Sequence, residues 1–200
     1  MNQNFMKEKP IPPLVLSMAL PMTISMLVNS LYNIVDSYFV AQISENAMTA
    51  LSLVYPIQNI VTAVTVGFGI GINALVAFYL GAGQGHLANR ATSLGMLCNI
   101  VHGILLTIFC IGIMPMYLNI FTDNSDIFSQ GILYSQIVFS FSIPVSISIS
   151  FEKIFQAVGR MKVSMICMII GCVTNIILDA LFIILFGWGL AGAALATAVS

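Results

Sequence analysis

The sequence predicts an all-α integral membrane protein, and its composition and patterning both support this. Of its 200 residues, 59% are hydrophobic and only 6% are charged, whereas soluble domains contain about 25% charged residues. The mean hydropathy is +1.02. Apolar residues gather in long segments that reach the length of a membrane span, about 20 residues. The net charge of -1 provides no basic surface for nucleic acid.

Six spans are expected along the chain, after a short polar lead over 1–12 and within a transmembrane lobe over 13–200. These spans are expected at 14–40, 48–80, 87–113, 128–158, 163–186 and 190–200. We expect the third to stop before Pro115 and Pro144 to interrupt the fourth, because proline removes a helix hydrogen bond. The sixth is incomplete at Ser200, so we expect the sequence to be cut inside this helix.

The positions of lysine and arginine predict the orientation in the membrane. The basic residues of the lead and of alternate loops are Lys7, Lys9, Arg90, Arg160 and Lys162. The remaining loops contain no lysine or arginine. This bias predicts a multi-pass protein of the cell membrane with a cytoplasmic N-terminus.

A polar stripe runs along the first span. Asn29, Tyr32, Asn33 and Asp36 follow the spacing of one helix face. An ionised carboxylate within a bilayer is costly, so this face is expected to line a protein interior or a wet cavity. Pro21 lies earlier in the same span, and we hypothesise that it is a hinge whose bend responds to protonation of Asp36.

A second stripe occupies the fifth span. Met168, Cys172, Asn175 and Asp179 are spaced by four, three and four residues, again one helix face. The Asn175–Asp179 pair repeats the polar character of the first stripe. The fifth span is therefore expected to present amide and carboxylate groups to the same interior.

The two stripes are expected to meet in the outer half of the membrane. Asp179 and Thr197 each lie nine residues from Trp188, about 13 Å along a helix. Asp36 falls in the same half when it is counted from the cytoplasmic end. Asp36, Asn175, Asp179 and Thr197 can therefore share one layer of the bundle.

Two carboxylates in such a layer can take up a proton or coordinate Na⁺ with help from amide and hydroxyl oxygens. The alternative is that each aspartate only accepts hydrogen bonds and ties helices together. The matched depth of Asp36 and Asp179 favours the ion site. No other metal and no cofactor are expected, and His86 and His102 have no partners for an enzymatic site.

Glu152 is a third acid within the expected spans. One interpretation pairs it with a basic loop residue near the interface, and the other makes it an inner-facing attraction for a cationic substrate. Gln156 is its neighbour one turn later, whereas the adjacent Lys153 is expected to point elsewhere.

Several ordered motifs resemble the multidrug and toxic compound extrusion (MATE) family. They are the run from Pro21 through Asn29, Tyr32–Asn33 and Asp36 to Phe39–Val40, then Gly81–Gly83 before Ala88–Arg90, then Phe155–Arg160, Asn175–Ile183 and Gly187–Thr197. The resemblance implies twelve helices in two six-helix lobes. This chain would supply the N-terminal lobe with its sixth helix cut, and the C-terminal lobe would be absent.

The resemblance also implies roles for single residues. The coupling-ion site would be formed by Asp36, Asn175, Asp179 and Thr197. The substrate cavity would be lined by Asn29, Tyr32, Tyr134 and Met168. Glu152 has no fixed counterpart across the family and is assigned to the cavity because some bacterial drug exporters carry an acid nearby.

The family implies cation-coupled export of amphipathic, often cationic compounds by alternating access, with H⁺ or Na⁺ as coupling ion. The expected partners are small organic substrates, the lipid bilayer and the missing C-terminal lobe. One alternative is a non-transporting remnant or scaffold. Another is a lipid-linked sugar flippase of the same superfamily, which ranks lower because such proteins tend to line their cavities with basic residues. An enzyme is not expected.

Overall fold

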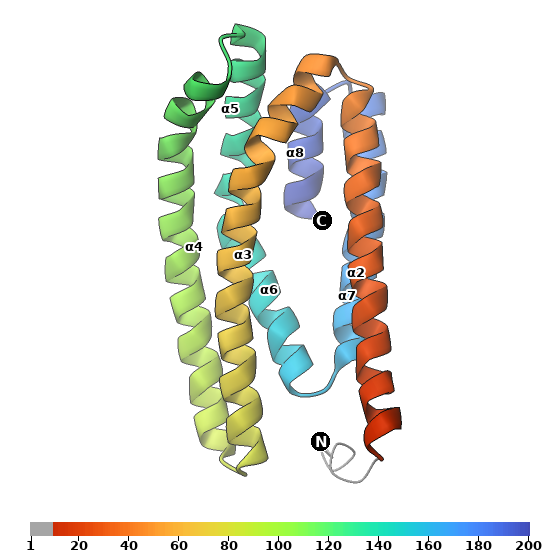
Figure 1. Cartoon of the computed structure of the whole chain (residues 1–200), viewed down its shortest axis with the longest axis vertical. Helices are drawn as coiled ribbons and strands as arrows, with labels where there is room; N and C mark the ends of the chain where they lie inside the picture. The colour runs from red at the N-terminus through yellow and green to blue at the C-terminus, as the bar shows by residue number, and fades with distance from the viewer. Residues whose placement is uncertain (1–9) are drawn as a thin grey trace.

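The computed structural model describes residues 10–200, and these residues form helices without any strand. In chain order the helices are α2 (Ile11–Ala41), α3 (Glu45–Gly81), α4 (Gly85–Phe121), α5 (Ser125–Ser140), α6 (Ser142–Ala157), α7 (Met161–Asp179), the π-helix η1 (Ala180–Leu185) and α8 (Gly189–Val199). The all-α prediction is confirmed (Figure 1). Lys7, Lys9 and most of the lead lie outside the described residues.

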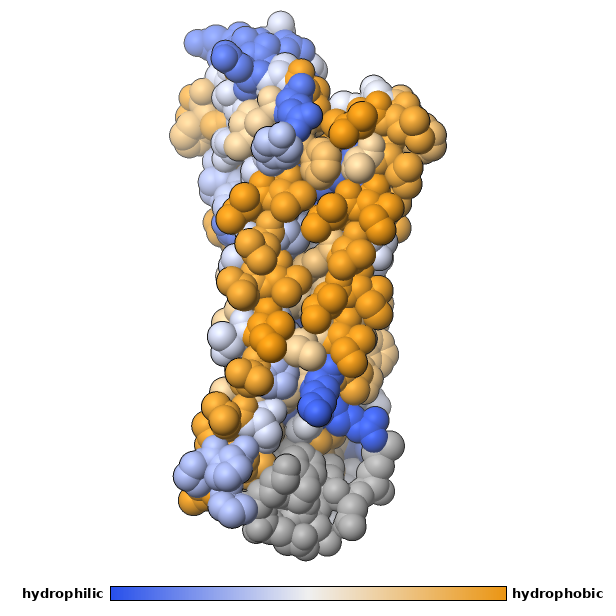
Figure 2. All heavy atoms as spheres, turned by 90° about the vertical axis from the view of Figure 1, so that its right-hand side faces the viewer, coloured by the Kyte–Doolittle hydropathy of each residue, from blue (hydrophilic) through white to orange (hydrophobic). Residues whose placement is uncertain are grey.

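The long helices suit a bilayer. Within residues 10–200, α2, α3, α4 and the continuous segment Met161–Leu185 are each long and apolar enough to cross a membrane. α5 and α6 together form a further candidate that is bent by 47°. Figure 2 shows hydrophobic side chains covering the middle of one face, with hydrophilic residues towards its two ends. α8 has 11 residues and is shorter than a span.

Helix α4 continues through Pro115 to Phe121, so the expected end of the third span is wrong. A proline removes one backbone donor, but in a membrane helix neighbouring helices can compensate for the local loss. Met114 and Leu118 flank Pro115 and are both buried in the hydrophobic core. Packing on both sides of the proline keeps the helix intact.

Pro144 has the opposite effect, as the sequence predicts. The chain breaks between α5 and α6 at Phe141, because Pro144 cannot donate to the carbonyl one turn earlier. Side chains of α4 hold both sides of the bend. Thr107 Oγ1 donates to the Phe139 carbonyl at 3.0 Å, and Asn99 Nδ2 donates to the Ser146 carbonyl at 3.1 Å.

The hydrophobic core lies at one end of the bundle, near the short loops at 42–44, 122–124 and 186–188. It joins α3, α4, α5 and α8, with Val54, Met114, Phe139 and Ala193 among its buried residues. Figure 1 shows α2 and α7 running side by side, with α3 and α4 across the bundle from them. Residues of α2, α6, α7 and α8 line a cavity between these helices.

The contact between α4 and α6 is tight at Gly103. A Cβ added there would lie 3.1 Å from Ser146 Oγ and 3.4 Å from Ile143 Cα. We expect Gly103→Val to destabilise the purified protein by about 1–3 kcal/mol, the usual cost of overpacking. The measurement is the unfolding temperature in detergent.

Gly112→Val is the matched control, because a Cβ at Gly112 on the same helix meets nothing within 4 Å. It introduces the same β-branched side chain into open space. Equal unfolding temperatures for Gly103→Val and Gly112→Val would contradict the close α4–α6 contact.

Candidate functional site

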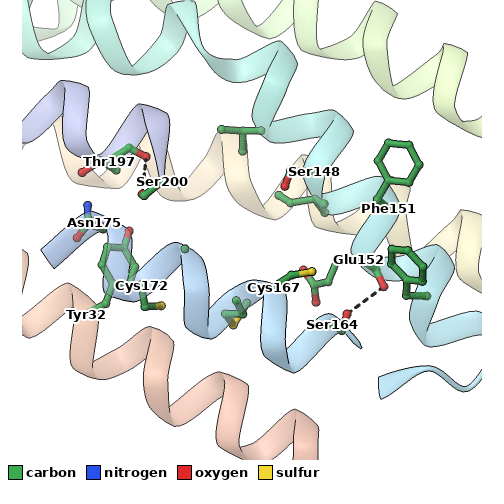
Figure 3. Close-up of a pocket in the computed structure, with 15 residues that line it drawn as sticks. Tyr32, Ser148, Phe151, Glu152, Ser164, Cys167, Cys172, Asn175, Thr197 and Ser200 are labelled. Carbon is green, nitrogen blue, oxygen red and sulfur yellow. Dashed lines mark hydrogen bonds between the residues drawn. The ribbon is translucent and has the colours of Figure 1, made fainter. Parts of the chain in front are cut away.

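A cavity of about 340 Å³ is lined by residues of α2, α6, α7 and α8 (Figure 3). Five of the predicted site residues line it, namely Tyr32, Glu152, Met168, Asn175 and Thr197. In Figure 3, Tyr32, Asn175 and Thr197 gather at one end, and Glu152 and Ser164 lie at the other. The cavity therefore joins two polar regions along an otherwise mainly apolar wall.

The aspartates of the two stripes meet beside this cavity. Asp36 of α2 and Asp179 of α7 are both buried, with 8% and 0% of their surfaces exposed. Their carboxyl groups lie close enough for a hydrogen bond between a carboxylic acid and a carboxylate. The two helices pack along each other, so the single-face spacing of each stripe brings the carboxyl groups together.

Most of the buried side-chain polar atoms that lack a hydrogen-bond partner within residues 10–200 lie around the carboxyl pair. Six of these nine atoms belong to it, namely Asp36 Oδ1, both Asp179 carboxylate oxygens, both side-chain amide atoms of Asn175 and Thr197 Oγ1. The large majority of buried side-chain polar atoms in proteins have such a partner. The four residues of the predicted ion site thus share the same deficit.

The oxygen atoms of these four side chains favour particular cations. Carboxylate, amide and hydroxyl oxygens are hard ligands that suit a proton or a hard cation such as Na⁺. Within residues 10–200, no three His, Cys, Asp or Glu side chains form a group that could hold a metal ion. Asp36 and Asp179 can bind a single positive charge between two helices.

Two tyrosines adjoin the carboxyl pair. Tyr32 lies four residues before Asp36 on α2 and lines the cavity. Tyr134 of α5 is buried, with 2% of its surface exposed, and does not line the cavity. Both rings are near enough to Asp36 and Asp179 to interact with them electrostatically.

Two predicted residues of α2 lie away from this cluster. Asn29 is exposed and does not line the cavity, and its carbonyl accepts a hydrogen bond from Asn33 Nδ2 at 2.7 Å. Pro21 is buried inside an unbroken helix. Ser25 Oγ donates to the Pro21 carbonyl at 2.9 Å.

Glu152 pairs with its sequence neighbour. Lys153 Nζ lies 3.0 Å from Glu152 Oε1, so the expectation that Lys153 points elsewhere is wrong. A Cβ on Gly69 would lie 2.8 Å from Lys153 Cγ, so the lysine stem lies against the bare glycine while the ammonium group reaches Glu152. Gln156 Nε2 also donates to Glu152 Oε1, at 2.6 Å.

Sequence reasoning missed four polar lining residues, Ser148, Ser164, Cys167 and the terminal Ser200. Ser148 stands one turn before Glu152, and Ser164 one turn before Met168. Extending each predicted polar face by one turn would have found Ser148 and Ser164. Cys167 adjoins the second stripe and carries no signal of its own.

Comparison with known proteins gives consistent results. The MatE family model matches residues 21–181. The multidrug export protein MepA of Staphylococcus aureus (strain NCTC 8325) is 26% identical over 197 residues, which are 98% of this chain and 44% of that protein. The chain therefore spans less than half the length of this relative.

Solved structures share the fold. A mutant of MATE superimposes with a TM-score of 0.93 at 22% identity, over 100% of this chain and 45% of that chain. An outward-facing multidrug resistance MATE family transporter of the MOP superfamily gives a TM-score of 0.89 at 24% identity, over 93% of this chain and 41% of that chain. The described helices thus have the fold of a half-length lobe.

The environments of two cysteines allow the cavity to be tested in membranes. Cys167 lines the cavity near the start of α7, whereas Cys98 lies in α4 on the outer surface, thirteen residues from the start of that helix. We expect a charged, membrane-impermeant thiol reagent in open vesicles to modify Cys167 and to spare Cys98, because hydrocarbon excludes the reagent.

The measurement uses two variants that each retain a single cysteine, with mass spectrometry as the readout. Unfolded protein is the control, in which both thiols must react. Equal labelling of Cys167 and Cys98 in vesicles would contradict a wet cavity at this position.

Proposed function

Because the chain belongs to the MatE family, we propose that it forms the N-terminal lobe of a multidrug efflux antiporter. In this proposal H⁺ or Na⁺ enters and drives export of amphipathic, often cationic compounds by alternating access. The cavity of this lobe faces a second, C-terminal lobe, and the substrate lies between the two.

The observation that carries the proposal is the deficit of partners at Asp36, Asn175, Asp179 and Thr197. Leaving a buried polar atom without a hydrogen bond costs about 1–3 kcal/mol, and more for a charged group. A protein that only needed to tie its helices together would be more stable with those atoms paired or replaced. A bound proton or Na⁺ supplies a partner for the carboxylate, amide and hydroxyl oxygens of this set.

Coupling follows from the electrostatics of the cavity. An empty carboxyl pair makes the cavity attractive to a cationic substrate, and a proton or Na⁺ at the pair removes that attraction. Tyr32 and Asn175 line the cavity beside the pair, so a bound substrate senses the change directly. Loading of the ion then favours release of the drug.

The cavity lining suits flat aromatic cations. Phe151, Phe155 and Met168 offer aromatic and polarizable surface, and Glu152 supplies an acid that Lys153 partly neutralises. No lysine or arginine lines the cavity within the described part of the chain. This supports drug export over movement of anionic lipid-linked sugars.

The positions of the basic residues support a cytoplasmic N-terminus. Arg90 lies near the connection between α3 and α4, and Arg160 and Lys162 adjoin the connection between α6 and α7. Figure 1 shows both connections towards the end of the bundle opposite the connection from α7 to α8, and the sequence of that last connection contains Trp188. Positively charged loops stay in the cytoplasm. We therefore propose that the carboxyl pair lies in the outer half of the cell membrane.

The first test is efflux of a fluorescent cationic dye from cells that express the complete reading frame. We expect Asp179→Asn to reduce efflux to the level of cells without the protein, because one of the two ion-binding carboxylates is lost. Collapse of one of the two gradients, of protons or of sodium, should abolish wild-type efflux, and the gradient that does so identifies the coupling ion.

Asp123→Asn is the matched control. It neutralises an exposed acid in the loop between α4 and α5, away from the cavity, and should leave efflux unchanged. Normal efflux by Asp179→Asn, at equal amounts of membrane-inserted protein, would refute the site assignment.

Pro21 gives a separate test of the hinge. We expect Pro21→Ala to restore a backbone hydrogen bond, stiffen α2 and lower the rate of efflux several-fold without lowering the unfolding temperature. Pro12→Ala is the control, because Pro12 lies in the first turn where no bond is lost. Wild-type efflux by Pro21→Ala would remove the hinge from the account.

A further inference from the structure

A second hollow lies on the outside of the bundle, between α3 and α4. It has a volume of about 1050 Å³ and shares no lining residue with the cavity beside the aspartates. In Figure 1 the two helices run side by side to the hairpin that joins them. We call this hollow the α3–α4 groove; it runs between Val64 and Tyr79 on α3 and between Leu87 and Cys98 on α4.

Glycines shape the α3–α4 groove. Gly67 and Gly71 lie one turn apart on α3, and a Cβ on either would meet nothing within 4 Å. On the facing helix, Gly95 lets Ile72 approach so closely that a Cβ there would lie 2.5 Å from Ile72 Cγ1. The two helices therefore touch at the base of the groove, while the missing side chains keep its mouth wide.

The dimensions match one leaflet of a bilayer. Val64 and Tyr79 are fifteen residues apart on α3, about 22 Å along the helix axis. One leaflet is about 15 Å thick in its hydrocarbon part and about 20–22 Å thick with its headgroups. Tyr79 stands two residues before the end of α3, and Arg90 five residues after the start of α4. The apolar part of the groove thus lies at acyl-chain depth, and its polar end lies at headgroup depth.

The polar end carries one positive charge, that of Arg90. Arg90 is exposed, and the sequence from 64 to 98 contains no Asp or Glu. Glu152, the acid paired with Lys153, does not line the groove. A guanidinium group binds phosphate through two parallel hydrogen bonds, and tyrosine favours the membrane interface.

We propose that the α3–α4 groove binds one anionic phospholipid from the surrounding bilayer. An acyl chain lies over Gly67 and Gly71 against Leu75 and Leu94, and Arg90 binds the phosphate of the headgroup. The site is independent of the export function, because it uses none of the residues around Asp36 and Asp179. Neutral phospholipids can fill the apolar part but gain less at Arg90.

The experiment is native mass spectrometry of the purified full chain in detergent, titrated with phosphatidylglycerol or with phosphatidylcholine. We expect the first phosphatidylglycerol to bind about fivefold more tightly than the first phosphatidylcholine, the contribution of one basic residue near a membrane surface. Arg90→Gln should abolish this preference, whereas Lys162→Gln, which removes an exposed charge outside the groove, should keep it.

A second pair of variants tests the acyl-chain part. Gly71→Leu places a side chain in the groove and should weaken binding of the first lipid at least fivefold. Gly112→Leu is the matched control, because it also projects into open space but from outside the groove. Unfolding temperatures establish that each variant is folded, and Arg90→Gln decides the question should Gly71→Leu fail to fold.

Equal affinity of the wild-type protein for the two lipids would overturn the proposal. So would an unchanged preference in Arg90→Gln. A groove covered by another protein segment or by a second copy would give no preferred first lipid and would overturn it as well.

Discussion

The structure depends on one constraint, which is that two buried carboxyl groups from different helices face each other inside a membrane bundle. Asp36 and Asp179 reach this position from different helices, and neither Asn175 nor Thr197 donates a hydrogen bond to them. In water such an arrangement would be unremarkable, but in a low-dielectric interior two bare negative charges are costly. The pair therefore needs a positive charge, and that need is the source of the proposed coupling.

The rest of the fold holds the pair beside a cavity. The hydrophobic core of α3, α4, α5 and α8 closes one end of the bundle, and the bend between α5 and α6 turns Glu152 towards the cavity. Asn99 and Thr107 fix that bend by bonding carbonyls on either side of it. This packing surrounds a polar centre whose energy changes with its occupant.

The sequence predicts the helices well because long apolar segments leave few alternatives. It also brings Asp36 and Asp179 into one layer, since helical spacing and depth are readable from residue numbers alone. The expected helix break is wrong at Pro115 and correct at Pro144, because packing decides whether a helix tolerates a proline. The prediction for Lys153 is wrong for a related reason. The path of its side chain depends on a glycine of another helix, which no local pattern reveals.

Infrared difference spectroscopy of the protein in lipid bilayers tests directly whether Asp36 and Asp179 share one positive charge. The carboxylic-acid band of each aspartate is followed as a function of pH. Asp179→Asn and Asp36→Asn assign the bands. If the two groups share one positive charge, the titration midpoint of Asp179 shifts when Asp36 is replaced by asparagine, and the converse shift is equal. Independent titration of the two aspartates would contradict a shared site.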